Sequence, residues 1–129
     1  MKRSGFLFLI AIGFFSLSAC YSREGGGGST SQIPALMSPA EISNKDAAAK
    51  NNEGVDHLVQ THYDVSEKLF REAVGLKPDF SEAHFNLGIA LDGMGKHEEA
   101  TEAFKKAMES GAGNPKIAEN AVLKKHLGM

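Results

Sequence analysis

The side chains of this 129-residue chain best suited to nucleophilic chemistry or metal binding are a single cysteine and five histidines. They are Cys20, His57, His62, His84, His97 and His126. The histidines are scattered, and none stands at a spacing typical of a zinc motif, such as His-Glu-x-x-His or paired cysteines and histidines. No serine lies in a recognisable nucleophile motif, and catalysis would need a nucleophile, a base and an oriented partner. We therefore predict no enzyme activity, no catalytic residue, no metal site and no bound cofactor.

Cys20 follows a segment with the build of a secretory signal peptide. Lys2 and Arg3 give it a positively charged start, and residues 6–15 form an apolar run. The run is shorter than the roughly 20 apolar residues that cross a bilayer, so we expect residues 1–19 to be cleaved off. A single cysteine cannot form an intramolecular disulfide, and its position behind the apolar run suggests another use for the thiol.

The residues Leu17, Ser18, Ala19 and Cys20 resemble the lipobox of bacterial lipoproteins. That resemblance implies a diacylglyceryl group on the Cys20 thiol, with membrane lipid as its partner. Two or three acyl chains make a stable anchor, whereas one chain holds a protein only weakly. Tyr21 stands where an inner-membrane retention signal would have aspartate. The resemblance thus implies export and, in a Gram-negative host, an outer-membrane anchor facing the periplasm. The alternatives are an uncleaved helical anchor and a buried structural cysteine.

The exported part would be mildly acidic and would begin with a tether. Without Lys2 and Arg3, the 14 basic residues of the chain fall to 12 against 16 acidic ones, a formal charge near −4. This balance gives no electrostatic reason to expect nucleic acid as a partner. Residues 20–37 hold the cysteine and four consecutive glycines, so we expect a flexible leash, because glycine loses the most entropy on ordering.

A regular period runs through the rest of the chain. Identical residues recur at one constant offset in five pairs: Gly54 and Gly88, Phe70 and Phe104, Ala73 and Ala107, Asn52 and Asn86, and Ala49 and Ala83. Within residues 81–114, apolar residues spaced as helix faces end at Gly95 and again near Gly111. The period therefore predicts two successive helix pairs.

The unit at residues 81–114 resembles a tetratricopeptide repeat. The family pattern is matched there at Leu87, Gly88, Leu91, Ala100, Phe104 and Ala107. The unit at residues 47–80 matches it at Gly54, Tyr63, Phe70, Ala73 and Pro78, and departs from it at Glu53, His57 and Ser66. The resemblance implies an all-α fold, in which antiparallel helix pairs form a short tetratricopeptide-type α-solenoid over residues 38–129. A helix at residues 115–127 would cap the two repeats, which are fewer than the three usually needed for stability.

Three capping patterns set the expected helix starts. Residues 38–41, Ser-Pro-Ala-Glu, read as a capping box with proline at the first helical position, which would start the first helix before Ala47. Residues 79–82 offer the same arrangement for the third helix. Asn114 and Pro115 would open the terminal helix.

By resemblance, the first helix of each pair would line a concave groove. Its residues would be Asn51, Val55, Leu58, Glu82, Phe85, Ile89, Asp92 and Leu123. An apolar strip with polar edges suits an extended peptide or an amphipathic helix of a protein partner. The alternative is that Phe85 and Ile89 pack against the chain's own tether or against another copy.

These features predict a membrane-anchored adaptor that holds a protein partner at the cell envelope. A second hypothesis is a structural envelope protein that self-associates and uses its groove as the contact between copies. A third is an accessory factor that handles metal or haem. Repeat scaffolds share a fold without sharing a function, so the partner is not named by the sequence.

Overall fold

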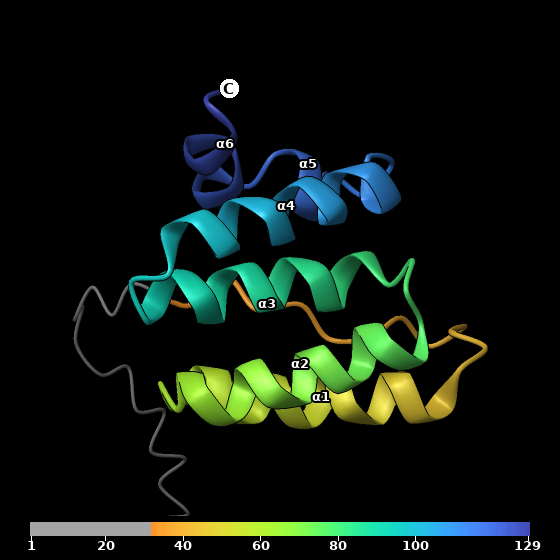
Figure 1. Cartoon of the computed structure of the whole chain (residues 1–129). Helices are drawn as coiled ribbons and strands as arrows, with labels where there is room; N and C mark the ends of the chain where they lie inside the picture. The colour runs from red at the N-terminus through yellow and green to blue at the C-terminus, as the bar shows by residue number, and fades with distance from the viewer. Residues whose placement is uncertain (1–31) are drawn as a thin grey trace, which may run out of the picture. The chain divides into compact units, whose positions relative to one another are not determined.

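Six α-helices form in residues 32–129, the part of the chain that the computed structural model describes (Figure 1). They are α1 (Lys45–Val59), α2 (Tyr63–Leu76), α3 (Ser81–Gly93), α4 (His97–Gly111), α5 (Pro115–Ala118) and α6 (Ala121–Leu127). The predicted signal peptide, the lipobox with Cys20 and the glycine-rich part of the predicted tether lie outside the described residues.

The helices stack as antiparallel pairs. α1 packs against α2 and α3 against α4, while α2 and α3 join the two pairs. α5 and α6 lie against α4 at the C-terminal end of the stack (Figure 1). The predicted all-α fold of antiparallel helix pairs is therefore confirmed. Over residues 32–129, no helix combines the length and apolar character that a membrane span requires.

One packing contact occurs twice, once in each pair. Gly54 of α1 faces Phe70 of α2, and Gly88 of α3 faces Phe104 of α4. A Cβ atom added to either glycine would lie 2.5 Å from the Cε1 atom of that phenylalanine, well inside the contact distance of two carbons. Both phenylalanines are fully buried. The repeat period in the sequence thus records a repeated helix-to-helix contact.

The larger of two apolar core clusters in the described residues passes through both pairs and the C-terminal helices. It contains Leu58 and Phe70 from the first pair, Phe104 from the second, and Ile117 and Leu123 from α5 and α6. Because these side chains are buried together, the two repeats and the cap stabilise one another.

Two predicted helix caps are wrong. α1 begins at Lys45, where the Asn44 side chain accepts a hydrogen bond from the Ala47 amide at 3.0 Å. Residues 38–41 therefore do not cap it. The reason is tertiary: the Asn44 side chain also donates to the Leu76 carbonyl of α2 at 3.0 Å, which ties the helix start to its partner. α3 begins at Ser81 without a side-chain cap from residues 79–82.

The capping helix predicted over residues 115–127 is instead two short helices. Asn114 accepts from the Lys116 amide and Pro115 follows, so the predicted opening of this segment is confirmed. Asn120 then accepts from the amides of Val122 and Leu123 and starts α6 anew. An asparagine cap inside the segment breaks the helix because it satisfies the amides that a continuous helix would bond internally.

Candidate peptide-binding groove

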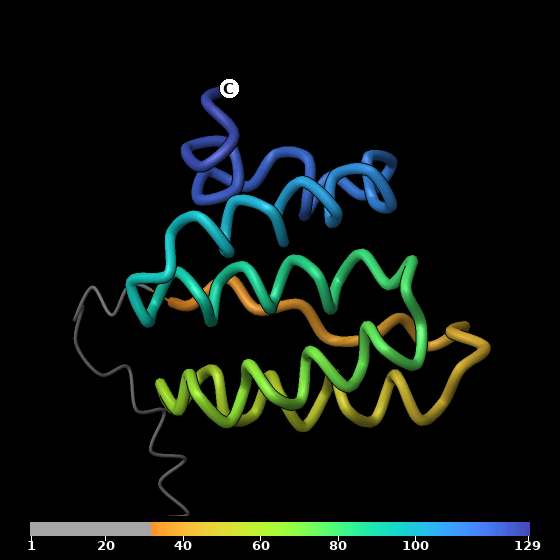
Figure 2. The backbone as a smooth tube through the Cα atoms, in the orientation of Figure 1, coloured from red at the N-terminus to blue at the C-terminus, as the bar shows by residue number. Residues whose placement is uncertain are grey.

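An extended segment of the chain itself lies along the first helices of the two pairs. We call residues 33–38 the N-terminal strap; Figure 2 shows it in orange, running alongside α3. Ile33, Ala35 and Leu36 are partly buried and pack against the core cluster. The predicted end of the tether at residue 37 is therefore wrong, because this segment packs as part of the folded unit.

Asn86 of α3 binds the backbone of the strap at Leu36. Its Oδ1 accepts from the Leu36 amide at 2.8 Å, and its Nδ2 donates to the Leu36 carbonyl at 2.7 Å. Asn51 of α1 donates to the same carbonyl at 3.1 Å, and its Oδ1 accepts from Asn86 Nδ2 at 2.8 Å. Both asparagines are fully buried. The site thus binds backbone amide and carbonyl groups, which every extended peptide carries.

Asn52 of α1 repeats this contact two residues further along the strap. Its Oδ1 accepts from the Ser38 amide at 2.8 Å, as that of Asn86 does from the Leu36 amide. Asn52 and Asn86 occupy equivalent positions, one repeat period apart. Successive repeats therefore bind alternate residues of one extended segment. Neither asparagine was among the predicted groove residues, although an identical polar pair at the repeat offset was the signal that could have found them.

Four of the eight predicted groove residues meet at this place, but they are covered. Asn51 binds the strap, and Val55, Phe85 and Ile89 belong to the cluster against which the strap packs. None of these four is more than 7% exposed. The groove is occupied by the chain's own tether. This is the alternative expected from the sequence, in which Phe85 and Ile89 pack against the tether or against another copy. Leu58 and Leu123 are fully buried core residues.

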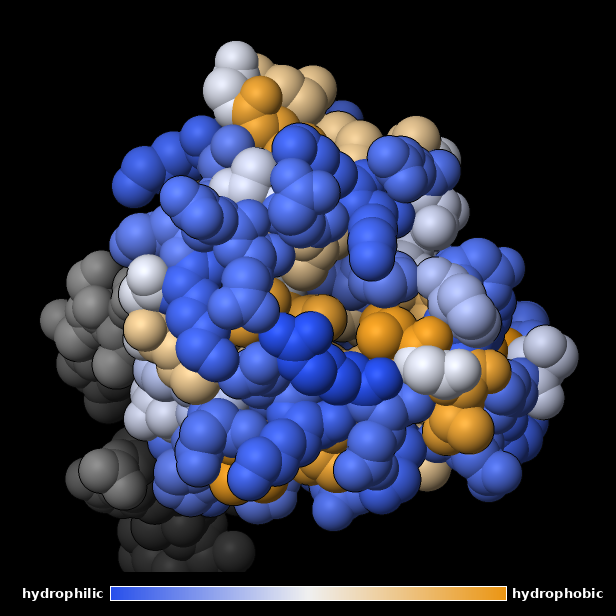
Figure 3. Space-filling model, viewed as in Figure 1, coloured by the Kyte–Doolittle hydropathy of each residue, from blue (hydrophilic) through white to orange (hydrophobic). Residues whose placement is uncertain are grey.

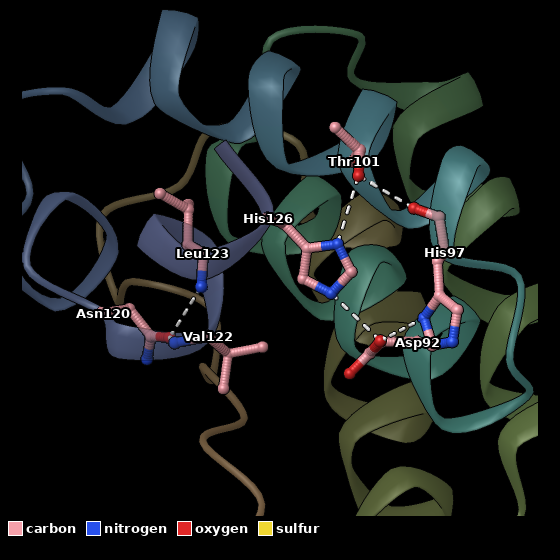
Figure 4. Close-up of polar contacts among 7 residues, drawn as sticks. All are labelled: Asp92, His97, Thr101, Asn120, Val122, Leu123 and His126. Carbon is pink, nitrogen blue, oxygen red and sulfur yellow. Dashed lines mark hydrogen bonds and ion pairs between the residues drawn. The ribbon is translucent and has the colours of Figure 1, made fainter. Parts of the chain in front are cut away.

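Two predicted groove residues, Glu82 and Asp92, have hydrogen-bond partners away from the strap. Glu82 accepts from Asn114 at 3.1 Å, which ties α3 to the connection between α4 and α5. Asp92 turns to His97 and His126 at the opposite end of α3 (Figure 4). Neither carboxylate has a hydrogen bond to residues 33–38.

The histidines fall into three groups. His57 and His62 lie near each other at the turn between α1 and α2, with their Nδ1 atoms 3.5 Å apart. His84 is buried and bonds through Nε2 to the Pro78 carbonyl at 2.8 Å. His97 and His126, which the sequence left scattered, meet at Asp92. Their meeting depends on how α6 folds back on α4, which no local spacing records.

The face drawn in Figure 3 is mainly hydrophilic, with apolar residues confined to small areas between the polar ones. Ion pairs link α2 to the start of α4: Glu67 binds Arg71 at 2.8 Å and Lys96 at 3.0 Å, and Arg71 also binds Glu99 at 2.9 Å. Exposed pairs of this kind contribute little to stability, typically below about 1 kcal/mol. This outer face resembles an ordinary solvated surface, whereas the strap lies on an apolar one.

Comparison with known proteins agrees with the geometry of the second pair. Residues 81–110 match the model of a family described as tetratricopeptide repeat. These residues cover α3 and nearly all of α4. No curated protein and no solved structure matches the chain.

Proposed function

We propose that this all-helical protein is a lipid-anchored adaptor at the cell envelope. It carries a tetratricopeptide repeat, and such repeats generally bind protein or peptide partners. Its groove would bind an extended apolar segment of a partner protein, which would take the place of the strap. The observation that carries this proposal is the bonding of Asn51, Asn52 and Asn86 to strap backbone.

The strap would act as an internal stand-in for the partner. Backbone bonds to alternate residues do not depend on side-chain identity, while the apolar cluster favours residues such as Ile33 and Leu36. A segment attached to its own groove competes at an effective concentration in the roughly millimolar range. A partner would therefore need either a better apolar match or confinement to the same membrane.

The proposed anchor would provide that confinement. Ile33 is 13 positions after Cys20, which limits the distance between lipid and strap to about 45 Å when fully extended. The four lipobox residues and the apolar run before them support the anchor. The sequence shows no recognisable catalytic motif, which favours an adaptor over an enzyme. Outer-membrane attachment facing the periplasm remains part of the proposal.

A peptide-binding measurement tests the groove. The probe is a fluorescent peptide with the sequence of residues 32–39, and the protein is the full chain in detergent. The double variant Ile33→Ser/Leu36→Ser should loosen the strap and bind the probe at least about tenfold more tightly than the wild type, because each lost apolar contact costs on the order of 1 kcal/mol or more. Adding Asn86→Ala should abolish that gain, since the backbone bonds are lost.

Leu76→Ser is the matched control, because Leu76 is 48% exposed and lies at the end of α2. It should leave the affinity of the probe unchanged. Equal binding by wild type and double variant would overturn the displacement idea, as would full binding in the presence of Asn86→Ala. If the double variant instead dimerises in sedimentation experiments, the self-associating alternative is favoured.

The anchor is tested by labelling cells with an alkyne fatty acid. The wild type should incorporate the label and fractionate with membranes, because acylated Cys20 inserts into lipid. Cys20→Ser should lose both the label and the membrane association. Ser22→Ala, two residues away, serves as the control and should retain both. Labelling of the Cys20→Ser variant would contradict the proposed anchor.

A further inference from the structure

Three side chains from three helices converge beside the end of α3. Asp92 comes from α3, His97 is the first residue of α4, and His126 comes from α6. One ligand atom from each lies within 4.8 Å of the other two. Asp92 Oδ1 is 2.8 Å from His97 Nδ1 and 3.0 Å from His126 Nε2 (Figure 4). A tetrahedral zinc ion with bonds near 2.1 Å needs ligand atoms roughly 3.4 Å apart, so small side-chain rotations would suffice.

Thr101 determines which nitrogen of His126 faces this cluster. Its single hydroxyl hydrogen is directed to the His97 carbonyl, 2.8 Å away. Its oxygen can then only accept from His126 Nδ1, at 3.1 Å, so Nδ1 carries a hydrogen. Metal-binding histidines are held in the same way, with the second ring nitrogen donating to an oxygen of the protein. His126 therefore presents Nε2 to Asp92 as a potential ligand.

The contact between His126 Nε2 and Asp92 Oδ1 offers a place for a cation when Nδ1 donates to Thr101. An unprotonated ring nitrogen and a carboxylate oxygen are both acceptors, so at 3.0 Å they repel each other unless a proton or a metal ion lies between them. The His126 side chain is only 11% exposed, and its ring packs on Phe104 with centroids 5.0 Å apart. Water is thus largely kept from one side of the site, which strengthens electrostatic attraction there.

We propose that Asp92, His97 and His126 bind one divalent transition-metal ion, for which Zn²⁺ is the best match. Two imidazole nitrogens and one carboxylate oxygen form a donor set suited to zinc and similar ions, and a poor one for Ca²⁺ or Mg²⁺, which prefer all-oxygen sites. The C-terminal end of α3 adds the negative pole of the helix. Lys125 lines the same hollow, of about 270 Å³, and its positive charge moderates the affinity.

The ion would join α6 to the second repeat. Its three ligands come from α3, α4 and α6, so binding would clip the short C-terminal helix onto the stack. A fourth position would stay open for water or for a ligand from another molecule. This site is separate from the strap, so its test does not depend on the proposed peptide binding.

Zinc titration of the full chain carrying Cys20→Ser, in detergent, tests the proposal without a competing thiol. We expect one Zn²⁺ per chain by calorimetry, and a rise in Tm on the order of 10 °C at a hundredfold excess over Kd. Co²⁺ should give the visible bands of a low-symmetry, four-coordinate site. His97→Ala and Asp92→Asn should each weaken binding at least about tenfold, and His126→Ala should abolish it.

The controls separate loss of ligands from loss of fold. His97 has a 70% exposed side chain, and Asp92→Asn keeps its shape, so neither change removes core packing. The double variant His57→Ala/His62→Ala removes the other neighbouring histidines and should leave zinc affinity unchanged. Absence of saturable binding would mean that a proton alone bridges His126 and Asp92, and would overturn the proposal. Unchanged affinity in His97→Ala and Asp92→Asn, or loss only in the histidine control, would do the same.

Discussion

At the residue scale, buried polar side chains decide what the groove can bind. Asn51 and Asn86 are fully buried on otherwise apolar helix faces, where an unsatisfied amide would cost roughly 1–3 kcal/mol. Each is satisfied by the backbone of Leu36 and by the other asparagine. A peptide that replaces the strap must therefore present a carbonyl and an amide at the same place. This requirement selects extended backbone and places few demands on side chains.

His84 yields a prediction about pH at the same scale. Burial lowers its pKa below the ordinary value of 6.5; the bond to the Pro78 carbonyl opposes this shift, Lys106 adds to it and Glu109 opposes it. Because the unfolded chain takes up the proton more readily, the contribution of neutral His84 is complete above about pH 6.5 and is lost as the pH falls through the lowered pKa. His84→Gln should therefore flatten the fall in urea midpoint between about pH 7.5 and 5.

The bonding of His84 explains the direction of this effect. Nε2 donates to Pro78, so Nδ1 carries the lone pair, and among the described residues it has no hydrogen-bond partner. Protonation would place a charge on that buried atom. His57→Gln, at the turn between α1 and α2, is the control and should keep the wild-type slope. An equally steep slope in His84→Gln would contradict the assignment.

At the element scale, two glycine–phenylalanine contacts set the distance between paired helices. Gly54 and Gly88 lie at equivalent repeat positions and each accepts a phenylalanine ring against its backbone. Ser66 and Ala100, which are also equivalent in the two repeats, are fully buried in α2 and α4. Close approach of the helices thus depends on small side chains at fixed positions, which is why the period is visible in the sequence.

Gly88→Ala should lower the free energy of unfolding by about 1–3 kcal/mol, because the new methyl group would overlap the Phe104 ring in a filled core. Gly75→Ala is the matched control. A Cβ at Gly75 meets nothing within 4 Å, and Gly75 is in α2, so alanine should stabilise by up to about 1 kcal/mol. Chemical denaturation of both variants measures the two effects. If the two variants had equal free energies of unfolding, the Phe104 ring would be able to move away from the new methyl group without loss of stability.

At the scale of the whole molecule, two repeats remain folded because other segments cover them. The strap covers the apolar faces of the first helices, and α5 and α6 cover the open side of α4. Their apolar residues join the same core cluster as those of both repeats. The strap and the C-terminal helices therefore bury the apolar faces that additional repeats would cover in a longer solenoid.

Leu123→Ala tests whether the cap and the repeats unfold together. Leu123 is fully buried in the shared core, so the substitution should cost about 2–5 kcal/mol. Because the core is continuous, helix loss and amide exchange should still follow one transition at a lower midpoint. Met129→Ala, at a residue that is 71% exposed, should leave the midpoint unchanged. Two separate transitions in Leu123→Ala would show that the cap folds independently.

The sequence by itself determined the elements that rest on local spacing. The repeat period predicts the helix pairs, and the contacts of Gly54 with Phe70 and of Gly88 with Phe104 recur at that period. Asn114 and Pro115 likewise marked a helix start, because a cap acts within a few residues. The lipobox and Cys20 stay a prediction.

Only the tertiary structure decided what fills the groove and which histidines meet. Leu36 and Asn86 are 50 residues apart, and the recurrence of Asn52 and Asn86 at the repeat offset does not identify the segment that they bind. His126 reaches Asp92 because α5 ends at Ala118 and Asn120 starts a new helix, which places α6 against α4. Such contacts depend on the path of the chain between elements. They therefore become visible only when the elements are assembled.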